Sequence, residues 1–283
     1  MIFQCIVMYR IFIGFLLCCC IDAAGQELYV FSEPASNMPA HSIAVKLGSN
    51  FIAKSNNAEN RFMQRYTPEV MFGVNKKLML HTGVTFADMH TSNLRWESVY
   101  TYAKYRFLSS DEVHKHFRMA AFADMSYSRS NFSYDELSIA GDKSGIQAGI
   151  IATQLWNKLA ISGSASYLRA FENPTVYHHT PEPVMNAVNY NLSSGYLVLP
   201  VNYTNYDQVN MNVYVELLGQ QSLDRRLHFT DIAPALQFIF KSTSKLNIGY
   251  RFQLAGNMER MTKQSWLLGY EYTFLNALKK RKR

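Results

Sequence analysis

Apolar and polar residues alternate at every second position through most of this chain. In the segment SWLLGYEYTF near the C-terminus, every second residue is apolar or aromatic: Trp266, Leu268, Tyr270, Tyr272 and Phe274. Successive side chains of a β-strand point to opposite faces, so this period predicts strands rather than helices. An apolar face must lie against another apolar surface, and the nature of that surface decides the fold.

The same period returns in about twelve segments of roughly ten residues each, the length with which a tilted strand crosses a bilayer. The segments begin near Ser42, Arg65, Leu78, Ser98, Phe117, Gly145, Leu159, Ala187, Met211, Ile232, Leu246 and Ser265. Long polar loops largely alternate with short turns between them, although 109–116 and 200–208 are longer than a tight turn. This alternation is typical of the hairpins of an up-and-down barrel.

Ionisable residues concentrate on one face of each predicted strand, and the other face carries almost no charge. The charged set is Arg65, Glu69, His81, Lys104, Arg106, Arg118, Asp124, Glu216, Arg251 and Glu271. The same faces are rich in Gly, Ser and Ala, and aromatic residues gather at the strand ends as they do in interface girdles. We therefore expect a transmembrane antiparallel up-and-down β-barrel of about 12 strands (about 10 to 14), with the charged set lining its lumen. A secreted β-sandwich or a lipocalin-like barrel is the alternative, since both also alternate.

The first 25 residues have the features of a cleaved signal peptide. Arg10 precedes a short apolar run, and the small residues Ala23 and Gly25 follow it. A retained anchor and a lipoprotein are the alternatives. We expect the remainder to comprise a short periplasmic N-terminal segment (26–40), an outer-membrane β-barrel (41–275) and a basic C-terminal tail (276–283). All four cysteines lie in the predicted signal, at Cys5, Cys18, Cys19 and Cys20. The mature chain would then hold no disulfide and no thiol nucleophile.

The GQE sequence after the signal, the repeated ten-residue amphipathic strands and the aromatic last strand resemble outer-membrane β-barrel proteins of Gram-negative bacteria. The Asn- and Tyr-rich loops resemble barrels of the Bacteroidetes type whose function is uncharacterised. The resemblance implies a place in the cell outer membrane with both termini in the periplasm, and the lipid and the barrel-assembly machinery as partners. The chain departs from the family pattern in one respect. Nine residues follow Phe274, where such barrels usually end in an aromatic residue that the machinery recognises.

For such a barrel we expect a porin-like role, as a channel, transport or binding component for small polar or ionic solutes. Lumenal charges of both signs could also pair with one another and fill the interior. That arrangement would suit a structural or surface-interaction barrel with an occluded lumen, which is the second hypothesis.

A lipid-modifying barrel enzyme is the third hypothesis, with Ser126 or Ser164 and His228 as candidate nucleophiles and base. No GxSxG, HExxH or phosphate-binding loop occurs in the sequence. We therefore expect no catalytic residues, no hydrolase or acyltransferase activity and no cofactor.

A long predicted loop, 171–183, contains the metal candidates His178, His179 and Glu182. Imidazole and carboxylate groups bind zinc or copper, so metal ions are possible partners, but adjacent histidines are also ordinary loop residues. The run from Lys279 to Arg283 could touch anionic lipid headgroups or remain a solvated tail. No basic helix or aromatic-basic motif accompanies it, so we expect no nucleic-acid partner.

Overall fold

The computed structural model describes residues 29–53, 62–89, 93–130, 132–139, 141–171, 177–178, 183–200 and 207–279. Within them, no helix is long and apolar enough to cross a membrane. Twelve long strands are present: β1 (Ser42–Ile52), β2 (Met63–Gly73), β3 (Leu78–Ala87), β4 (Arg95–Glu112), β5 (Lys115–Ser128), β7 (Gly145–Trp156), β8 (Leu159–Ala170), β10 (Asn186–Leu199), β11 (Asn210–Ser222), β12 (His228–Phe240), β13 (Ser244–Gly256) and β14 (Gln264–Phe274).

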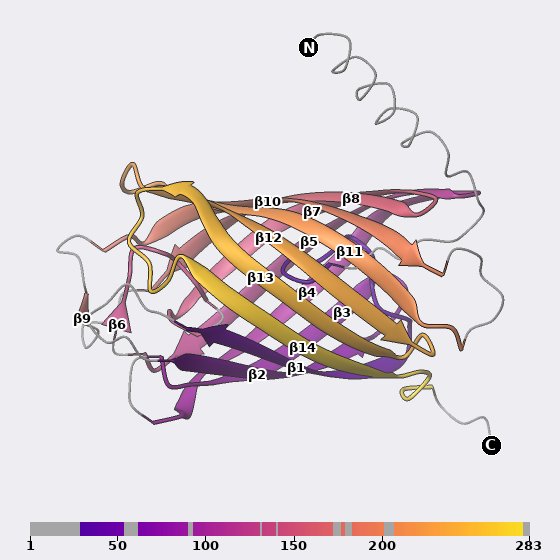
Figure 1. Cartoon of the computed structure of the whole chain (residues 1–283), viewed down its shortest axis with the longest axis horizontal. Coiled ribbons are helices and arrows are strands. Elements are labelled where there is room, and N and C mark those ends of the chain that lie inside the picture. The colour runs from indigo at the N-terminus through magenta and orange to yellow at the C-terminus, as the bar shows by residue number, and fades with distance from the viewer. Residues whose placement is uncertain are drawn as a thin grey trace, which may run out of the picture.

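These twelve strands form one closed antiparallel barrel in which each long strand pairs with its neighbours along the chain (Figure 1). The first and last strands close it, with Val45 opposite Tyr272 and Leu47 opposite Tyr270. The strand number, the antiparallel order and this closure confirm the fold predicted from the sequence. Closure also leaves no free sheet edge, which a sheet surrounded by lipid requires.

The outer face of the barrel is apolar. In β14, Trp266, Leu268 and Tyr270 are 52%, 43% and 49% exposed, whereas Glu271 is only 8% exposed. Large apolar side chains stand out in the same way on the other strands, among them Val45, Met125, Ile150, Leu192 and Val215. An exposed apolar face that continues around a closed barrel suits hydrocarbon and not water.

The two ends of the barrel differ in their connections. At one end, here the short-turn end, the strands are joined by residues 74–77, 113–114, 157–158 and 241–243, together with the connection from β10 to β11. The opposite, long-loop end carries the connections β1–β2, β3–β4, β5–β7, β8–β10, β11–β12 and β13–β14. A small parallel sheet of β6 (Phe132–Ser133) and β9 (Tyr177–His178) lies there, at the left of Figure 1.

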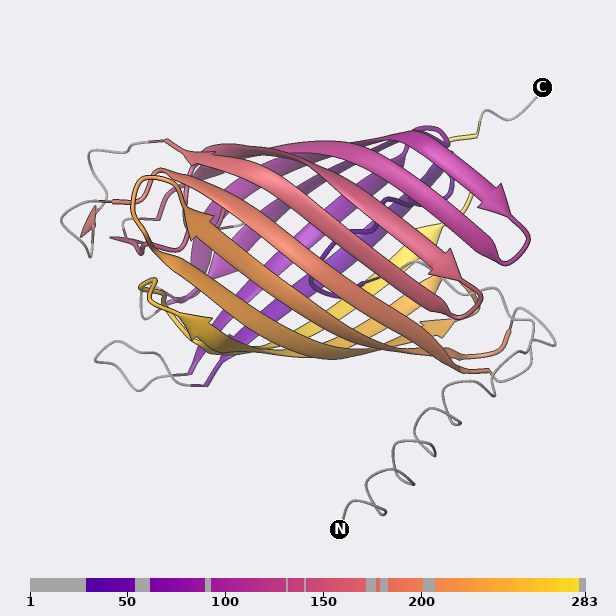
Figure 2. The same cartoon turned by 90° about the horizontal axis from the view of Figure 1, so that it is seen from above.

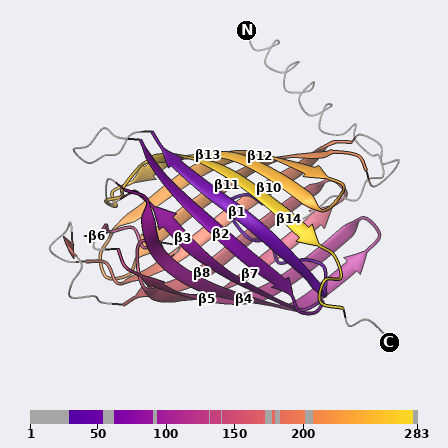
Figure 3. The ribbon, with the colours of Figure 1, turned by 90° about the horizontal axis from the view of Figure 1, so that it is seen from below.

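Residues 29–41, here the lumenal segment, run inside the barrel before β1 begins. Figures 2 and 3 show this indigo stretch within the ring of strands. Residues 26–40 are predicted above to form a periplasmic segment outside the barrel. In the structure, the described part of that stretch, residues 29–40, lies inside the barrel instead. The segment has no apolar period of its own, so nothing in its sequence indicates that the barrel wall provides its partners.

Glu216 of β11 anchors the start of the lumenal segment. Its Oε1 accepts hydrogen bonds from the backbone N–H groups of Val30 and Phe31, both at 2.9 Å, and its Oε2 accepts one from the Ser32 hydroxyl at 2.6 Å. Lys104 of β4 holds the middle, where its Nζ donates to the backbone oxygens of Pro34 (2.7 Å) and Ser36 (2.9 Å). A buried charge is tolerated where hydrogen bonds of this kind satisfy it.

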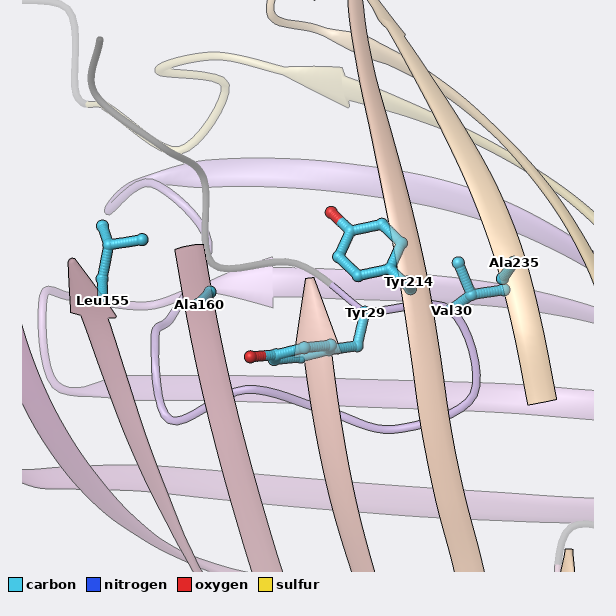
Figure 4. Packing of buried hydrophobic residues seen from close by; sticks show 6 residues of the cluster. All are labelled: Tyr29, Val30, Leu155, Ala160, Tyr214 and Ala235. Carbon is cyan, nitrogen blue, oxygen red and sulfur yellow. The ribbon is translucent and has the colours of Figure 1, made fainter. Parts of the chain in front are cut away.

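Apolar contacts complete the anchorage. Tyr29 and Val30 pack in a buried cluster with four wall residues, Leu155, Ala160, Tyr214 and Ala235 (Figure 4). The rings of Tyr29 and Tyr214 meet edge to face, with centroids 5.5 Å apart. Phe31 lies so close to Gly249 of β13 that a Cβ there would come within 2.5 Å of its ring. Glycine at this position therefore makes room for the segment.

Candidate functional site

Two cavities lie in the barrel interior. The larger, of about 650 Å³, reaches the short-turn end, where Pro39, His116 and Ser242 line it. The smaller, of about 380 Å³, reaches the long-loop end, where Ile52, Met89 and Thr262 line it. Both cavities are lined by the same six residues, here called the neck: Val30, Phe31, Lys46, Glu69, Tyr100 and Asn247. The cavities therefore follow one another along the barrel and meet at the neck.

An ion pair lies on one side of the neck. Lys46 of β1 and Glu69 of β2 occupy paired positions, and Lys46 Nζ is 3.5 Å from Glu69 Oε1. Tyr100 of β4 lies across Gly83 of β3, where a Cβ would come within 2.6 Å of its ring. Asn247 of β13 accepts a hydrogen bond from Gln237 Nε2 at 2.9 Å. Polar wall groups thus face the two apolar residues that the lumenal segment contributes.

Acidic and basic side chains form ion pairs at the larger cavity. Lys245 Nζ contacts Glu271 Oε1 at 2.6 Å, and Lys104 Nζ contacts Glu33 Oε2 at 3.1 Å. Glu33 belongs to the lumenal segment. Burial opposes its ionisation, but the neighbouring cations, Lys104 foremost, outweigh burial and lower the pKa of Glu33 to about 2. Glu33 therefore stays charged throughout the neutral range.

A second charged network lines the smaller cavity. Arg260, from the loop before β14, contacts both carboxylate oxygens of Asp231 at 2.8 and 2.9 Å and reaches Glu136 at 2.9 Å. Arg251 of β13 joins the same two carboxylates, and its Nη2 is 3.3 Å from Glu136. Because Glu136 lies in the loop between β5 and β7, the network ties two long-loop connections into the barrel mouth.

The ten charged residues singled out from the sequence fall into four groups. Glu69, His81, Arg118, Asp124 and Glu271 line the larger cavity. Arg65 and Arg251, again with Glu69, line the smaller one. Lys104 and Glu216 hold the lumenal segment. Arg106 is half-buried and lines neither cavity.

Some charged residues that line the cavities, Lys46 and Glu33 among them, were not singled out from the sequence. Lys46 could have been found, since it stands between the outward residues Val45 and Leu47 and so faces inward. Glu33 could not, because it lies in the lumenal segment, which has no strand period. Lys245, the partner of Glu271, also lay outside the charged set singled out from the sequence.

The side chains of the three metal candidates lie outside the described part of the structure. His178 belongs to β9, of whose side chains nothing is described, and His179 and Glu182 are outside the described residues. Within the described part of the chain, no group of three or more His, Cys, Asp or Glu residues could hold a metal ion.

The candidate nucleophiles have other hydrogen-bond partners. Ser126 donates to the backbone oxygen of Lys143 at 2.7 Å, and Ser164 accepts from Asn191 Nδ2 at 2.6 Å. The structure thus does not bring either serine together with His228 in a hydrogen bond.

Known structures share this architecture. An outer-membrane channel from Pseudomonas putida F1 superposes with a TM-score of 0.59, covering 87% of this chain and 100% of that one at 12% identity. The fold is that of an outer-membrane β-barrel. The KdgM porin (TM-score 0.45, 10% identity, 82% and 99% coverage) and the NanC porin (0.45, 12%, 81% and 98%) superpose less closely. No family model and no curated protein sequence matches the chain. At these identities the likeness concerns the fold alone.

Proposed function

We propose that this chain is a non-enzymatic outer-membrane channel for small polar or ionic solutes, with the short-turn end and both termini in the periplasm. One observation carries the proposal: two polar cavities in series, of about 650 and 380 Å³, share the residues of the neck. A barrel that only anchors a surface loop has no need of a charged interior reaching both ends. The apolar outer face and the fold shared with an outer-membrane channel support the membrane location.

The neck sets the expected behaviour of the channel. A solute must pass the Lys46–Glu69 pair, Tyr100 and Asn247 on the wall side and Val30 and Phe31 on the other side. A charged pair at a constriction selects solutes by charge as well as size. The larger cavity falls within the range of about 300–1,000 Å³ typical of small-molecule sites, so solutes of monosaccharide size suit it better than polymers.

Conductance and solute uptake test the proposal. Purified protein in planar bilayers should give single-channel steps, and liposomes containing it should swell in small sugars. A heat-modifiability gel on the same sample establishes that the barrel is folded. Folded protein that gives neither steps nor swelling would refute the channel.

An occluded barrel is the second candidate, favoured by the hydrogen bonds that hold the lumenal segment at Glu216 and Lys104. A variant lacking residues 29–39 separates the two. If only this variant conducts, the segment closes the lumen and the occluded barrel is correct. If both conduct, the segment shapes an open path.

A further inference from the structure

In the larger cavity, the buried atoms His81 Nε2, Tyr102 Oη and Asp124 Oδ1 have no hydrogen-bond partner among the described residues, and neither does Asn37 Oδ1 of the lumenal segment. They come from β3, β4 and β5, and their residues are direct cross-strand partners, since His81 pairs with Tyr102 and Tyr102 pairs with Asp124. All three line the larger cavity. Buried polar atoms nearly always have hydrogen-bond partners. Three such atoms without a partner in one row therefore indicate that a bound molecule supplies the hydrogen bonds.

Packing holds the row in place. The Tyr102 ring stacks on Phe122, with centroids 5.6 Å apart and planes 23° apart, and on its other side it contacts the His81 ring at 4.9 Å. Phe122 in turn packs against a buried cluster of Ala35, Ala120 and Ile151, in which Ala35 belongs to the lumenal segment. His81 is only 6% exposed. The His81 and Tyr102 rings therefore have fixed positions before any solute arrives, which lowers the entropy lost on binding.

Charge distinguishes Asp124 from the other acids of the cavity. The lining contains four carboxylates, Glu33, Glu69, Asp124 and Glu271, and three permanent cations, Lys46, Arg118 and Lys245. Glu33, Glu69 and Glu271 contact Lys104, Lys46 and Lys245 respectively, and Arg118 contacts Asp111. Among the described residues, no such ion pair is found at Asp124. The cavity thus offers one carboxylate for a cation brought by a solute.

The row also sets the length of that solute. Neighbouring strands lie about 4.8 Å apart, so three side chains across β3, β4 and β5 span roughly 10 Å. His81 and Tyr102 can each donate or accept a hydrogen bond and suit hydroxyl groups. Asp124 suits an ammonium group.

On the basis of the proposed function, we infer that His81, Tyr102 and Asp124 form a binding site for a small polyhydroxylated amine. Its ammonium group donates to Asp124 Oδ1, and its hydroxyl groups bond Tyr102 Oη and His81 Nε2. Solutes with this chemistry concentrate in the larger cavity before they pass the neck.

Calorimetry on the detergent-purified full chain tests the site with a matched pair of probes. Glucamine is the amine analogue of sorbitol and differs from it by one ammonium group in place of one hydroxyl. At neutral pH, glucamine should bind at least tenfold more tightly than sorbitol. Asp124→Asn should weaken glucamine binding at least tenfold and remove the preference, and Tyr102→Phe should weaken both probes. Glu112→Gln, a change at the exposed end of β4, is the control and should bind as the wild type does.

The heat-modifiability gel confirms that each variant is folded. Equal binding of the two probes to the wild type, undiminished glucamine binding by folded Asp124→Asn, or no binding at all would overturn the site. Conductance gives an independent answer for the channel. A protein that conducts but does not bind glucamine refutes the site alone, whereas one that binds glucamine without conducting upholds the site and refutes the channel.

Discussion

Lys46 and Glu69 face each other from paired positions on β1 and β2, with Nζ 3.5 Å from Oε1, where the two lumenal cavities meet. The pair therefore presents both signs of charge to one side of the neck. Removing either member changes the charge that the neck presents, and this makes the pair a direct test of what passes.

Glu69→Gln should shift ion selectivity towards anions, since Lys46 then faces the neck without its counter-charge. Lys46→Met should shift it towards cations for the converse reason. Reversal potentials under a salt gradient measure both shifts. Glu112→Gln removes a carboxylate outside the lumen and should leave the potential unchanged. Identical reversal potentials in all four proteins would mean that current does not pass this pair.

Glu216→Ala should loosen the lumenal segment and make the single-channel current larger and noisier. The substitution removes the acceptor of the Val30 and Phe31 N–H groups, and an unsatisfied buried donor costs about 1–3 kcal/mol. Glu216→Gln is the matched control because it keeps one acceptor oxygen, and its current should stay closer to that of the wild type. A Glu216→Ala current no different from the wild type would show that the segment is held elsewhere.

Gly249→Val should destabilise the protein by about 1–3 kcal/mol, the usual cost of overpacking, because its Cβ meets the Phe31 ring. Adding Phe31→Ala removes the clash, so the double variant should recover much of the loss. Urea denaturation of the two single variants and the double variant measures the coupling. Strictly additive effects would contradict the close approach of Phe31 to β13.

Leu192 and Asn191 are neighbours in β10, so Leu192→Arg and Asn191→Arg place the same charge on opposite faces of the strand. Leu192 is 54% exposed on the outer face, where an arginine at the bilayer midplane costs about 2–4 kcal/mol. Asn191 faces inward and bonds Ser164, so its replacement should cost less. The yield of folded barrel in lipid vesicles compares the two. Equal yields would argue against lipid as the environment of the outer face.

Much of the fold could be predicted because a strand repeats its chemistry every two residues. Tyr270 and Glu271 are neighbours in the chain, and the alternation assigned one to the outer surface and the other to the interior, as the structure shows. The alternation does not fix which residues pair where the first and last strands meet, and the structure supplies that register, with Val45 opposite Tyr272.

The neck could not be predicted in this way. It depends on the lumenal segment, whose contacts with Glu216 and Lys104 join residues far apart in the sequence and follow no period. The row of His81, Tyr102 and Asp124 required the register of three strands, which the alternation alone does not fix.

Cysteine accessibility at the neck tests the central claim most directly. The only cysteines of the sequence lie in the predicted signal, so an introduced thiol is unique in the mature chain. Asn247→Cys places it at the neck, and Ile248→Cys places it on the outer face, where the native side chain is 36% exposed. A charged methanethiosulfonate added to a conducting bilayer should reduce the single-channel current of Asn247→Cys and leave that of Ile248→Cys unchanged. Unchanged current after complete labelling of Asn247→Cys would contradict a solute path through the neck.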